Sequence, residues 1–363
     1  MKVFIKALAI PVILILAMPV AGTVFHGKSL APYLHFPPRP LYEPHAPFSP
    51  GLFILVLVLG LSFIFPFIIK GFRSGHGLGR EQGIRFPFPW WGKGAGVGLA
   101  AFWILAWTRF SWFAPLQDHT FFPLWLMFIL LVNALTIQAK GACPMTQKPK
   151  PFVLLFFVSA LFWWIFEFLN RFVSNWYYTV PDYTPLNYCL LATLSFSTVL
   201  PAVASVQALL TTRPLFRKGF SNFLRTGFTS SKPFTLGALV LSCASLFFMG
   251  IHPDTLFFLV WIAPFVIIVS ARTLAGNPTL LGETTRGEWN QVVSHALSAL
   301  VCGFFWEMWN YNSLAKWHYS IPFVHGVEIF EMPVLGYFGY LPFGIECALI
   351  IELVLNQWKP DEN

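Results

Sequence analysis

Two glutamate–asparagine pairs, each followed by a tryptophan–tyrosine stretch, are the residues of this chain best suited to chemistry. The two copies read Glu167-x-x-Asn170 with Trp176-x-Tyr178-x-x-Pro181, and Glu307-x-x-Asn310 with Trp317-x-Tyr319-x-x-Pro322. Residues three apart share one face of a helix, so each pair presents a carboxyl and an amide together. A carboxyl group can transfer protons, and an amide can donate a hydrogen bond to it or to a ligand.

Each copy also has a simpler interpretation. Arg171 lies four residues after Glu167, the favourable order for an intrahelical ion pair. Glu307 has Tyr311 at that position, so this explanation applies only to the first copy. Tryptophan and tyrosine are also typical of the membrane–water interface, where the prolines would turn the chain. Glu307 is therefore the stronger candidate of the two glutamates.

Other titratable groups concentrate around the second copy. His318 stands where the first copy has Tyr177, and Glu346 stands where the first copy has Ser205. Histidine transfers protons near neutral pH, and an acid inside a membrane helix is costly unless it has a role or a partner. We predict catalytic roles for Glu307, Glu346 and His318. The predicted substrate contacts are Asn310, Trp317, Tyr319 and Glu331, with Glu167, Asn170, Trp176 and Tyr178 of the first copy.

The elements that position these residues are predicted to be membrane-spanning helices. The chain is 56% hydrophobic and 10% charged, and apolar runs of about 20 residues are typical of such helices. Ten such runs are expected, at 7–24, 51–70, 94–113, 120–138, 151–173, 186–210, 233–250, 253–274, 290–312 and 335–357. The predicted fold class is an all-α integral membrane protein of about ten transmembrane helices, with no separate soluble domain.

The two motif copies indicate an internal duplication. Glu167 and Glu307 are 140 residues apart, and Trp176 and Trp317 are 141 apart. Each copy is expected to hold four helices, which makes the two copies parallel in the bilayer. The predicted organisation is two first helices with a Pro/His-rich and a Gly-rich loop (1–93), copy one (94–212), a basic linker (213–232), copy two (233–357) and a short tail (358–363).

The distribution of basic residues predicts the orientation. With the N-terminus inside, 18 of the 23 Lys and Arg residues fall on the inner side, as the positive-inside rule requires. The net charge of +8 is then a topological signal, and no nucleic-acid partner is expected. We expect both termini in the cytoplasm, a bacterial inner membrane as the location, and membrane lipids as neighbours. Residues 7–24 are expected to stay as a helix, because no A-x-A cleavage site follows them.

Several other functions lack their sequence signals. The five cysteines are scattered without a C-x-x-C pair, and the histidines have no helical i, i+4 spacing, so we predict no metal site. The Gly-rich loop at 71–98 lacks the G-K-[ST] ending of a phosphate-binding loop. The sequence therefore predicts no cofactor.

Two resemblances follow from the motif residues. The runs Phe330–Glu346 and Leu161–Tyr178 resemble segments of an uncharacterised family of polytopic bacterial membrane proteins. A fainter resemblance is to the membrane domains of carotenoid lycopene cyclases, which are also duplicated and place W-x-Y before a helix with P-x-E-E. Here Trp317-x-Tyr319 precedes Pro342 and Glu346, without the paired acids. This second resemblance implies an isoprenoid-like substrate.

Together these features favour a membrane enzyme that acts on a lipid or isoprenoid-like substrate, at a site opening to the outer face. A proton-linked transporter is the first alternative, because duplicated helix bundles with acids near the midplane are a common transporter plan. A structural or assembly subunit of a membrane complex is the second alternative.

Overall fold

The computed structural model describes residues 2–37, 41–77, 85–180, 183–227 and 231–355, with side chains from residue 8 onward. Pro181 of the first motif and the predicted tail 358–363 lie outside these residues. Within the described ranges helices dominate, and the strands form two small two-stranded sheets. The all-α class is thus confirmed, with a short β-ribbon that the sequence did not predict.

Eight helical segments are long and apolar enough to cross a membrane, or ten if each of two bent pairs counts as one span. Six are single helices: α1 (Lys2–Phe25), α3 (Pro50–Gly77), α5 (Phe121–Lys140), α7 (Pro149–Val173), α11 (Lys232–Met249) and α15 (Asn290–Tyr311). Two combine neighbouring elements: α8 (Pro185–Phe196) with α9 (Val199–Leu210), and η5 (Val334–Gly339) with α16 (Tyr340–Leu355). This number agrees with a multi-pass membrane protein.

The two bent pairs depart from the predicted straight helices. The helix expected at 94–113 is α4 (Trp90–Trp107), followed after a bend of 104° by η1 (Ser111–His119). The turn is stabilised by Arg109, whose guanidinium donates to the carbonyls of Ala106 (3.0 Å) and Asn312 (2.8 Å). The helix expected at 253–274 consists of α12 (Pro253–Leu256), η3 (Phe257–Trp261) and, after a bend of 51°, α13 (Ala263–Leu274). Pro264 lies at the start of α13 and supplies no backbone donor there.

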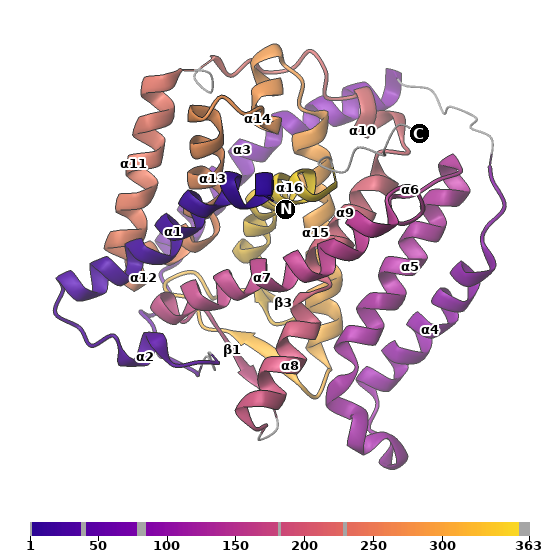
Figure 1. Cartoon of the computed structure of the whole chain (residues 1–363), viewed down its shortest axis with the longest axis horizontal. Helices are drawn as coiled ribbons and strands as arrows, with labels where there is room; N and C mark the ends of the chain where they lie inside the picture. The colour runs from indigo at the N-terminus through magenta and orange to yellow at the C-terminus, as the bar shows by residue number, and fades with distance from the viewer. Residues whose placement is uncertain (1, 38–40, 78–84, 181–182, 228–230, 356–363) are drawn as a thin grey trace.

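Four helices form the centre of the molecule, and a pair of helices flanks each side. In Figure 1, α7, α9, α15 and α16 occupy the middle, α4 and α5 lie to the right, and α11 and α13 lie to the left beside α1. α15 packs against both α16 and α9, and α9 also contacts α5 and α7. Short helices α2 (Ala31–Leu34), α6 (Pro144–Gln147), α10 (Pro214–Lys218) and α14 (Leu280–Glu283), with η4 (Thr284–Arg286), lie in the connections.

Large aromatic side chains join the flanking pairs to the central helices. Trp125 on α5 contacts Trp306 and Trp309 on α15, with ring centroids 5.1 Å apart in both cases. On the other side, Trp261 of η3 contacts Phe166 on α7 at 5.2 Å. Aromatic pairs of this kind add about 0.5–1.5 kcal/mol each beyond the area that they bury. The motif-bearing helices α7 and α15 are therefore fixed from both flanks.

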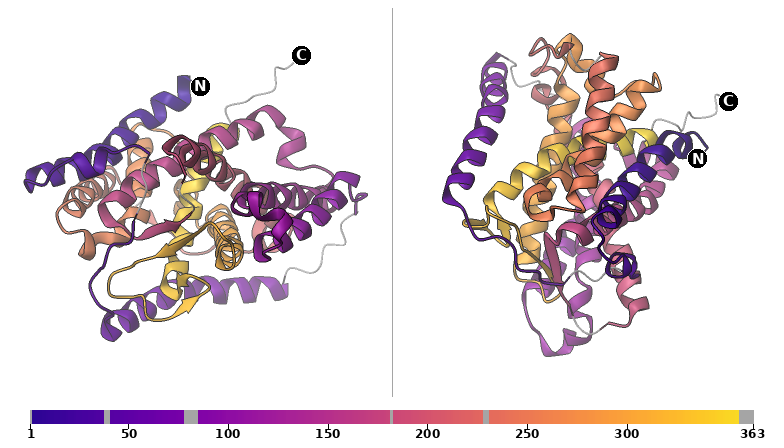
Figure 2. Two further views of the ribbon diagram at one scale, coloured as in Figure 1. Left: turned by 90° about the horizontal axis from the view of Figure 1, so that it is seen from below. Right: turned by 90° about the vertical axis from the view of Figure 1, so that its left-hand side faces the viewer.

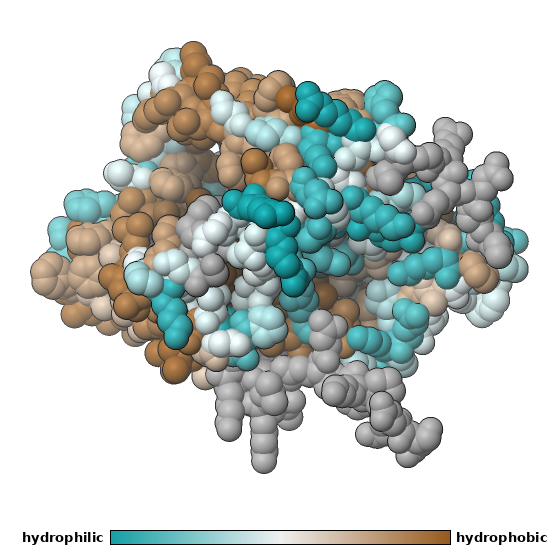
Figure 3. Space-filling view, turned by 90° about the horizontal axis from the view of Figure 1, so that it is seen from above, coloured by the Kyte–Doolittle hydropathy of each residue, from teal (hydrophilic) through white to brown (hydrophobic). Residues whose placement is uncertain are grey.

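The ends of the bundle differ in polarity. The β-ribbon lies at the lower end in Figure 1, whereas α10 and α14 lie at the upper end. The view from above in Figure 3 shows hydrophilic side chains across much of that upper face. Arg213, Arg217 and Lys218 are exposed there, on or beside α10. The upper face thus carries basic residues that the sequence assigns to the inner side.

Candidate functional site

The two W-x-Y stretches pair with each other in an antiparallel ribbon. β1 (Trp176–Thr179) and β2 (Lys316–Tyr319) align so that Trp176 opposes Tyr319 and Tyr178 opposes Trp317. At the centre Tyr177 opposes His318, and their rings stack 5.3 Å apart. Because the register is centred on this pair, the tryptophan of each copy lies opposite the tyrosine of the other. The ribbon therefore has a local two-fold arrangement.

The two asparagines fasten the ribbon to the helices. The Asn170 amide donates to the carbonyl of Trp176 (2.8 Å) and accepts from its backbone N–H (3.3 Å). Asn310 does the same with Trp317, at 2.8 and 2.9 Å. Both asparagines are almost completely buried. Both asparagine side chains therefore form hydrogen bonds to the backbone of the tryptophan that follows them. This contact gives a structural reason for the E-x-x-N…W spacing in both motifs.

Glu167 is surrounded by ring donors. Its Oε1 accepts hydrogen bonds from Trp163 Nε1 (3.2 Å), Trp176 Nε1 (3.0 Å) and the Tyr178 hydroxyl (2.6 Å). Arg171, expected to pair with Glu167, instead donates a hydrogen bond to the carbonyl of Tyr33. Glu167 is fully buried. Its hydrogen bonds link α7 to the β-ribbon.

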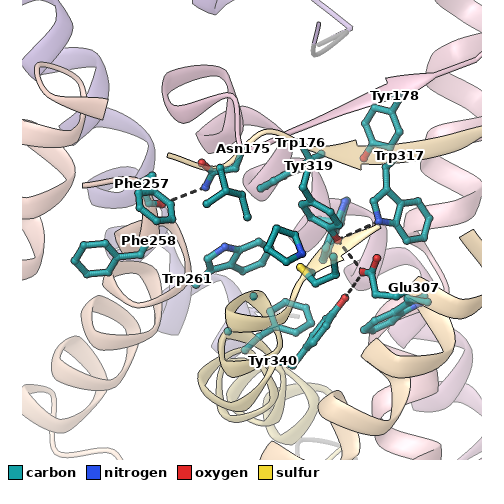
Figure 4. Close-up of a pocket in the computed structure, with 18 of the residues that line it drawn as sticks. Asn175, Trp176, Tyr178, Phe257, Phe258, Trp261, Glu307, Trp317, Tyr319 and Tyr340 are labelled. Atoms are coloured by element: carbon teal, nitrogen blue, oxygen red, sulfur yellow. Dashed lines mark hydrogen bonds between the residues drawn. The ribbon is translucent and has the colours of Figure 1, made fainter. Parts of the chain in front are cut away.

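Glu307 has a different set of partners. Its Oε1 accepts from the hydroxyls of Tyr319 and Tyr340, both at 2.7 Å (Figure 4). Trp317 Nε1 donates to the Tyr319 hydroxyl at 3.0 Å and so orients it toward the carboxyl group. Burial, and then the neighbouring Glu307, raise the pKa of Tyr319 well above its usual range. The Tyr319 hydroxyl therefore keeps its proton and acts as a donor.

A difference between the two motif regions of the sequence accompanies the role of Tyr340. The position of Trp163 in copy one is Gly303 in copy two, 140 residues later, and the position of Val199 is Tyr340, 141 later. A Cβ added to Gly303 would lie 2.4 Å from the Tyr340 ring, so the ring fills the space that a larger residue would occupy. Tyr340 thus supplies from α16 the donor that Trp163 supplies from α7.

A cavity of about 920 Å³ lies against the second motif. Its walls are mainly apolar and aromatic, and they include Trp163, Trp261, Trp306, Phe343 and Tyr340. Glu307 is on the wall, and its Oε2 is buried and has no hydrogen-bond partner. Cavities of about 300–1,000 Å³ with apolar walls and a few polar groups are typical of small-molecule sites. The wall therefore combines a large apolar and aromatic surface with the buried carboxyl group of Glu307.

The structure brings five of the eleven predicted site residues to the cavity wall. These are Glu307, Trp317, Tyr319, Trp176 and Tyr178. The remaining six, all within the described residues, are absent from the wall: Glu167, Asn170, Asn310, Glu331, His318 and Glu346.

His318 and Glu331 form a polar cluster with Lys316, which also lines the cavity. His318 Nδ1 lies 3.0 Å from Glu331 Oε2, and Lys316 Nζ also donates to Glu331. Successive residues of a strand point to opposite faces, so Trp317 and Tyr319 reach the cavity while His318 points away. Glu346 is buried within α16, one turn beyond Phe343, with its Oε2 unpaired.

Sequence reasoning missed Tyr340, Trp163, Trp261 and Trp306. A signal for Tyr340 existed in the sequence. When the two motif regions are aligned, Trp163 corresponds to Gly303 and Val199 corresponds to Tyr340, so the loss of a large side chain coincides with the gain of a tyrosine. Among the described residues no group of three or more His, Cys, Asp or Glu side chains comes together as metal ligands would.

No protein-family model, curated protein or solved structure matches the chain. The resemblances therefore rest on the quoted motif residues alone.

Proposed function

We propose that the protein is a membrane enzyme that binds a lipid or isoprenoid-like substrate in the 920 Å³ cavity and transfers a proton through Glu307. The observation that carries the proposal is the buried, unpaired Oε2 of Glu307, a residue on a mainly apolar and aromatic wall. A buried acceptor without a partner costs about 1–3 kcal/mol. A bound substrate with a hydroxyl group or another donor would remove that cost.

The surrounding donors suit Glu307 to acid–base chemistry. Tyr319 and Tyr340 hold one carboxyl oxygen at 2.7 Å each, which leaves the second oxygen to exchange a proton with the substrate. A positioned acid or base contributes about 10²–10⁴-fold to a reaction rate. Aromatic faces such as those of Trp261 and Trp306 also attract any positive charge that forms on the substrate.

We further propose that the scaffold is a tandem parallel repeat, with copies at 94–212 and 233–357, in a bacterial inner membrane with both termini cytoplasmic. The matching bonds of Asn170 and Asn310 support the repeat. The local two-fold register of the ribbon supports it too. The basic face around α10 supports this orientation.

A proton-linked transporter fits the cavity less well. On α16 the cavity wall extends only to Phe343, and Glu346 lies beyond it. A transport path through the second copy would have to continue past that residue. The geometry therefore favours a reaction site near the β-ribbon over a conduit.

The test is Glu307→Gln, compared with Glu283→Gln as a control. Glutamine keeps an oxygen that can accept from both tyrosines, so the fold should survive, but an amide cannot exchange the proton. Glu283 is half exposed and pairs with Arg286 on the surface. Lipid extracts of expressing cells are analysed by mass spectrometry. We expect Glu307→Gln to lower the amount of the enzyme's product by a factor of about 10² or more. Identical extracts from both variants and the parent protein would refute the enzymatic role. Loss of pH-driven solute uptake in Glu346→Gln, with unchanged lipids, would favour transport.

A further inference from the structure

Helix α3 borders the cavity without being part of the packed bundle. None of its described residues is buried, and Figure 2 shows it along one edge of the molecule in both views. Leu52, Val56, Leu59 and Gly60 nevertheless line the cavity. Their spacing places them on one helix face, which is turned toward the site.

Both ends of α3 are fixed. Near its C-terminal end, Phe67 contacts the rings of Phe223 (5.2 Å) and Trp289 (5.1 Å), and Ser74 Oγ donates to the carbonyl of Gly219 (2.6 Å). Just before its N-terminal end, the backbone N–H of Ser49 donates to the carbonyl of Phe323 (2.8 Å). The middle of the helix therefore spans the side of the cavity as a wall held at two points.

Helix α3 contacts η5 at the wall of the cavity. A Cβ added to Gly60 would lie 2.4 Å from the ring of Phe338, so helix and ring touch at this glycine. Gly60 is also the last residue along α3 on the cavity wall. Phe338 comes two residues before Tyr340, whose hydroxyl bonds Glu307. Along α3, the part of the cavity that lies between α3 and η5 therefore ends at this contact.

We propose that this space holds a single extended apolar chain of the substrate, and that the contact between Gly60 and Phe338 sets how long that chain can be. The inference rests on the proposed function and specifies its substrate class. The chain's polar end, a hydroxyl or similar donor, is directed toward Glu307, which lines the same cavity. Its apolar part contacts Val56, Leu59 and Leu335, whose side chains present no polar group to the cavity. α3 has no buried residue and lies at an edge of the molecule, so it is a thin wall between this part of the cavity and the surroundings.

The experiment measures which chain lengths the protein retains. Purified protein in detergent is incubated with an equimolar series of saturated fatty alcohols of graded length, washed, and extracted for mass spectrometry. Phe338→Ala opens the contact with Gly60 and should shift retention to longer alcohols. Gly60→Ala pushes the Phe338 ring into the space and should shift it to shorter ones. Gly51→Ala is the matched control, because a Cβ there meets no atom within 4 Å.

We expect the ratio of the retained amounts of two alcohols adjacent in length to change about tenfold or more in the two site variants. The reason is that one methylene in an apolar pocket gives about 10–200-fold discrimination. Gly51→Ala should match the parent protein. Equal chain preference in all four proteins, or no alcohol retained by the parent, would overturn the inference. Lipid extracts of Glu307→Gln cells decide the proposed function separately, so the two can fail independently. Monodisperse elution of each variant shows that it is folded.

Discussion

Replacing Gly303 by alanine should separate Tyr340 from Glu307. The added Cβ would lie 2.4, 2.5 and 2.7 Å from three atoms of the Tyr340 ring, all closer than folded proteins tolerate. Tyr340 lies at the start of α16, so its ring must rotate or the helices must separate. Either movement breaks the 2.7 Å bond from its hydroxyl to Glu307.

The size of the effect follows from three contributions. Overpacking of this kind costs about 1–3 kcal/mol. Loss of a hydrogen bond to a charged group costs about 1.5–3 kcal/mol. Alanine favours a helix over glycine by about 1 kcal/mol. The net free energy of unfolding should fall by about 1.5–5 kcal/mol. Under the proposed function, product formation should fall as well, because Glu307 loses one of its two donors.

The assay is unfolding of the purified protein in detergent, followed by tryptophan fluorescence. Gly237→Ala is the control, because its added Cβ meets no atom within 4 Å, and it should be as stable as the parent or slightly more stable. Adding Tyr340→Val to Gly303→Ala should recover the overpacking cost but not the product, since valine removes the clash and the hydroxyl together. If Gly303→Ala and Gly237→Ala have the same free energy of unfolding, then the contact between Gly303 and the Tyr340 ring does not position the Tyr340 hydroxyl on Glu307.

Two further predictions concern the scaffold. Asn170→Ala and Asn310→Ala should each lower the free energy of unfolding by about 2–4 kcal/mol, because each leaves a backbone donor and acceptor of the following tryptophan unpaired. Stability equal to that of the parent protein in both variants would contradict the fastening role. Reporters fused at Arg213 and at His325 should read inside and outside respectively, and the same side for both would reject the proposed orientation.

The helical spans could be predicted because their cause is local. Long apolar runs fold as helices in a membrane, whatever they pack against. The breaks were not predictable in the same way. Arg109 ends α4 by reaching the carbonyl of Asn312, about 200 residues further along the chain. No pattern within one segment contains that contact.

The β-ribbon shows a similar limit. Trp176 to Thr179 and Lys316 to Tyr319 have the aromatic composition of a strand, but each is too short to be stable alone. They form because α7 and α15 present them side by side and the two asparagines fasten them. Their aromatic residues led to the prediction that both stretches lie at the membrane–water interface. That prediction accounts for their composition, but it does not indicate that they pair with each other.

The sequence predicted that Glu307 is a better candidate for a functional role than Glu167, but it did not predict the contacts that distinguish them. An ion pair with Arg171 was expected to occupy Glu167, whereas its bonds come from Trp163, Trp176 and Tyr178. In copy two, Gly303 removes the indole donor, and Trp317 donates to Tyr319 rather than to the carboxyl group. Glu307 therefore has two donors from hydroxyls and stands on a cavity wall, while Glu167 has three and does not.

The residue at position 303 accounts for part of this difference. Gly303 stands 140 residues after Trp163, and the Tyr340 ring fills the space beside it. The proposed site at Glu307 should therefore be sensitive to the size of residue 303 and to the hydroxyl of residue 340. It should tolerate changes to His318 and Glu331, which bond each other away from the cavity.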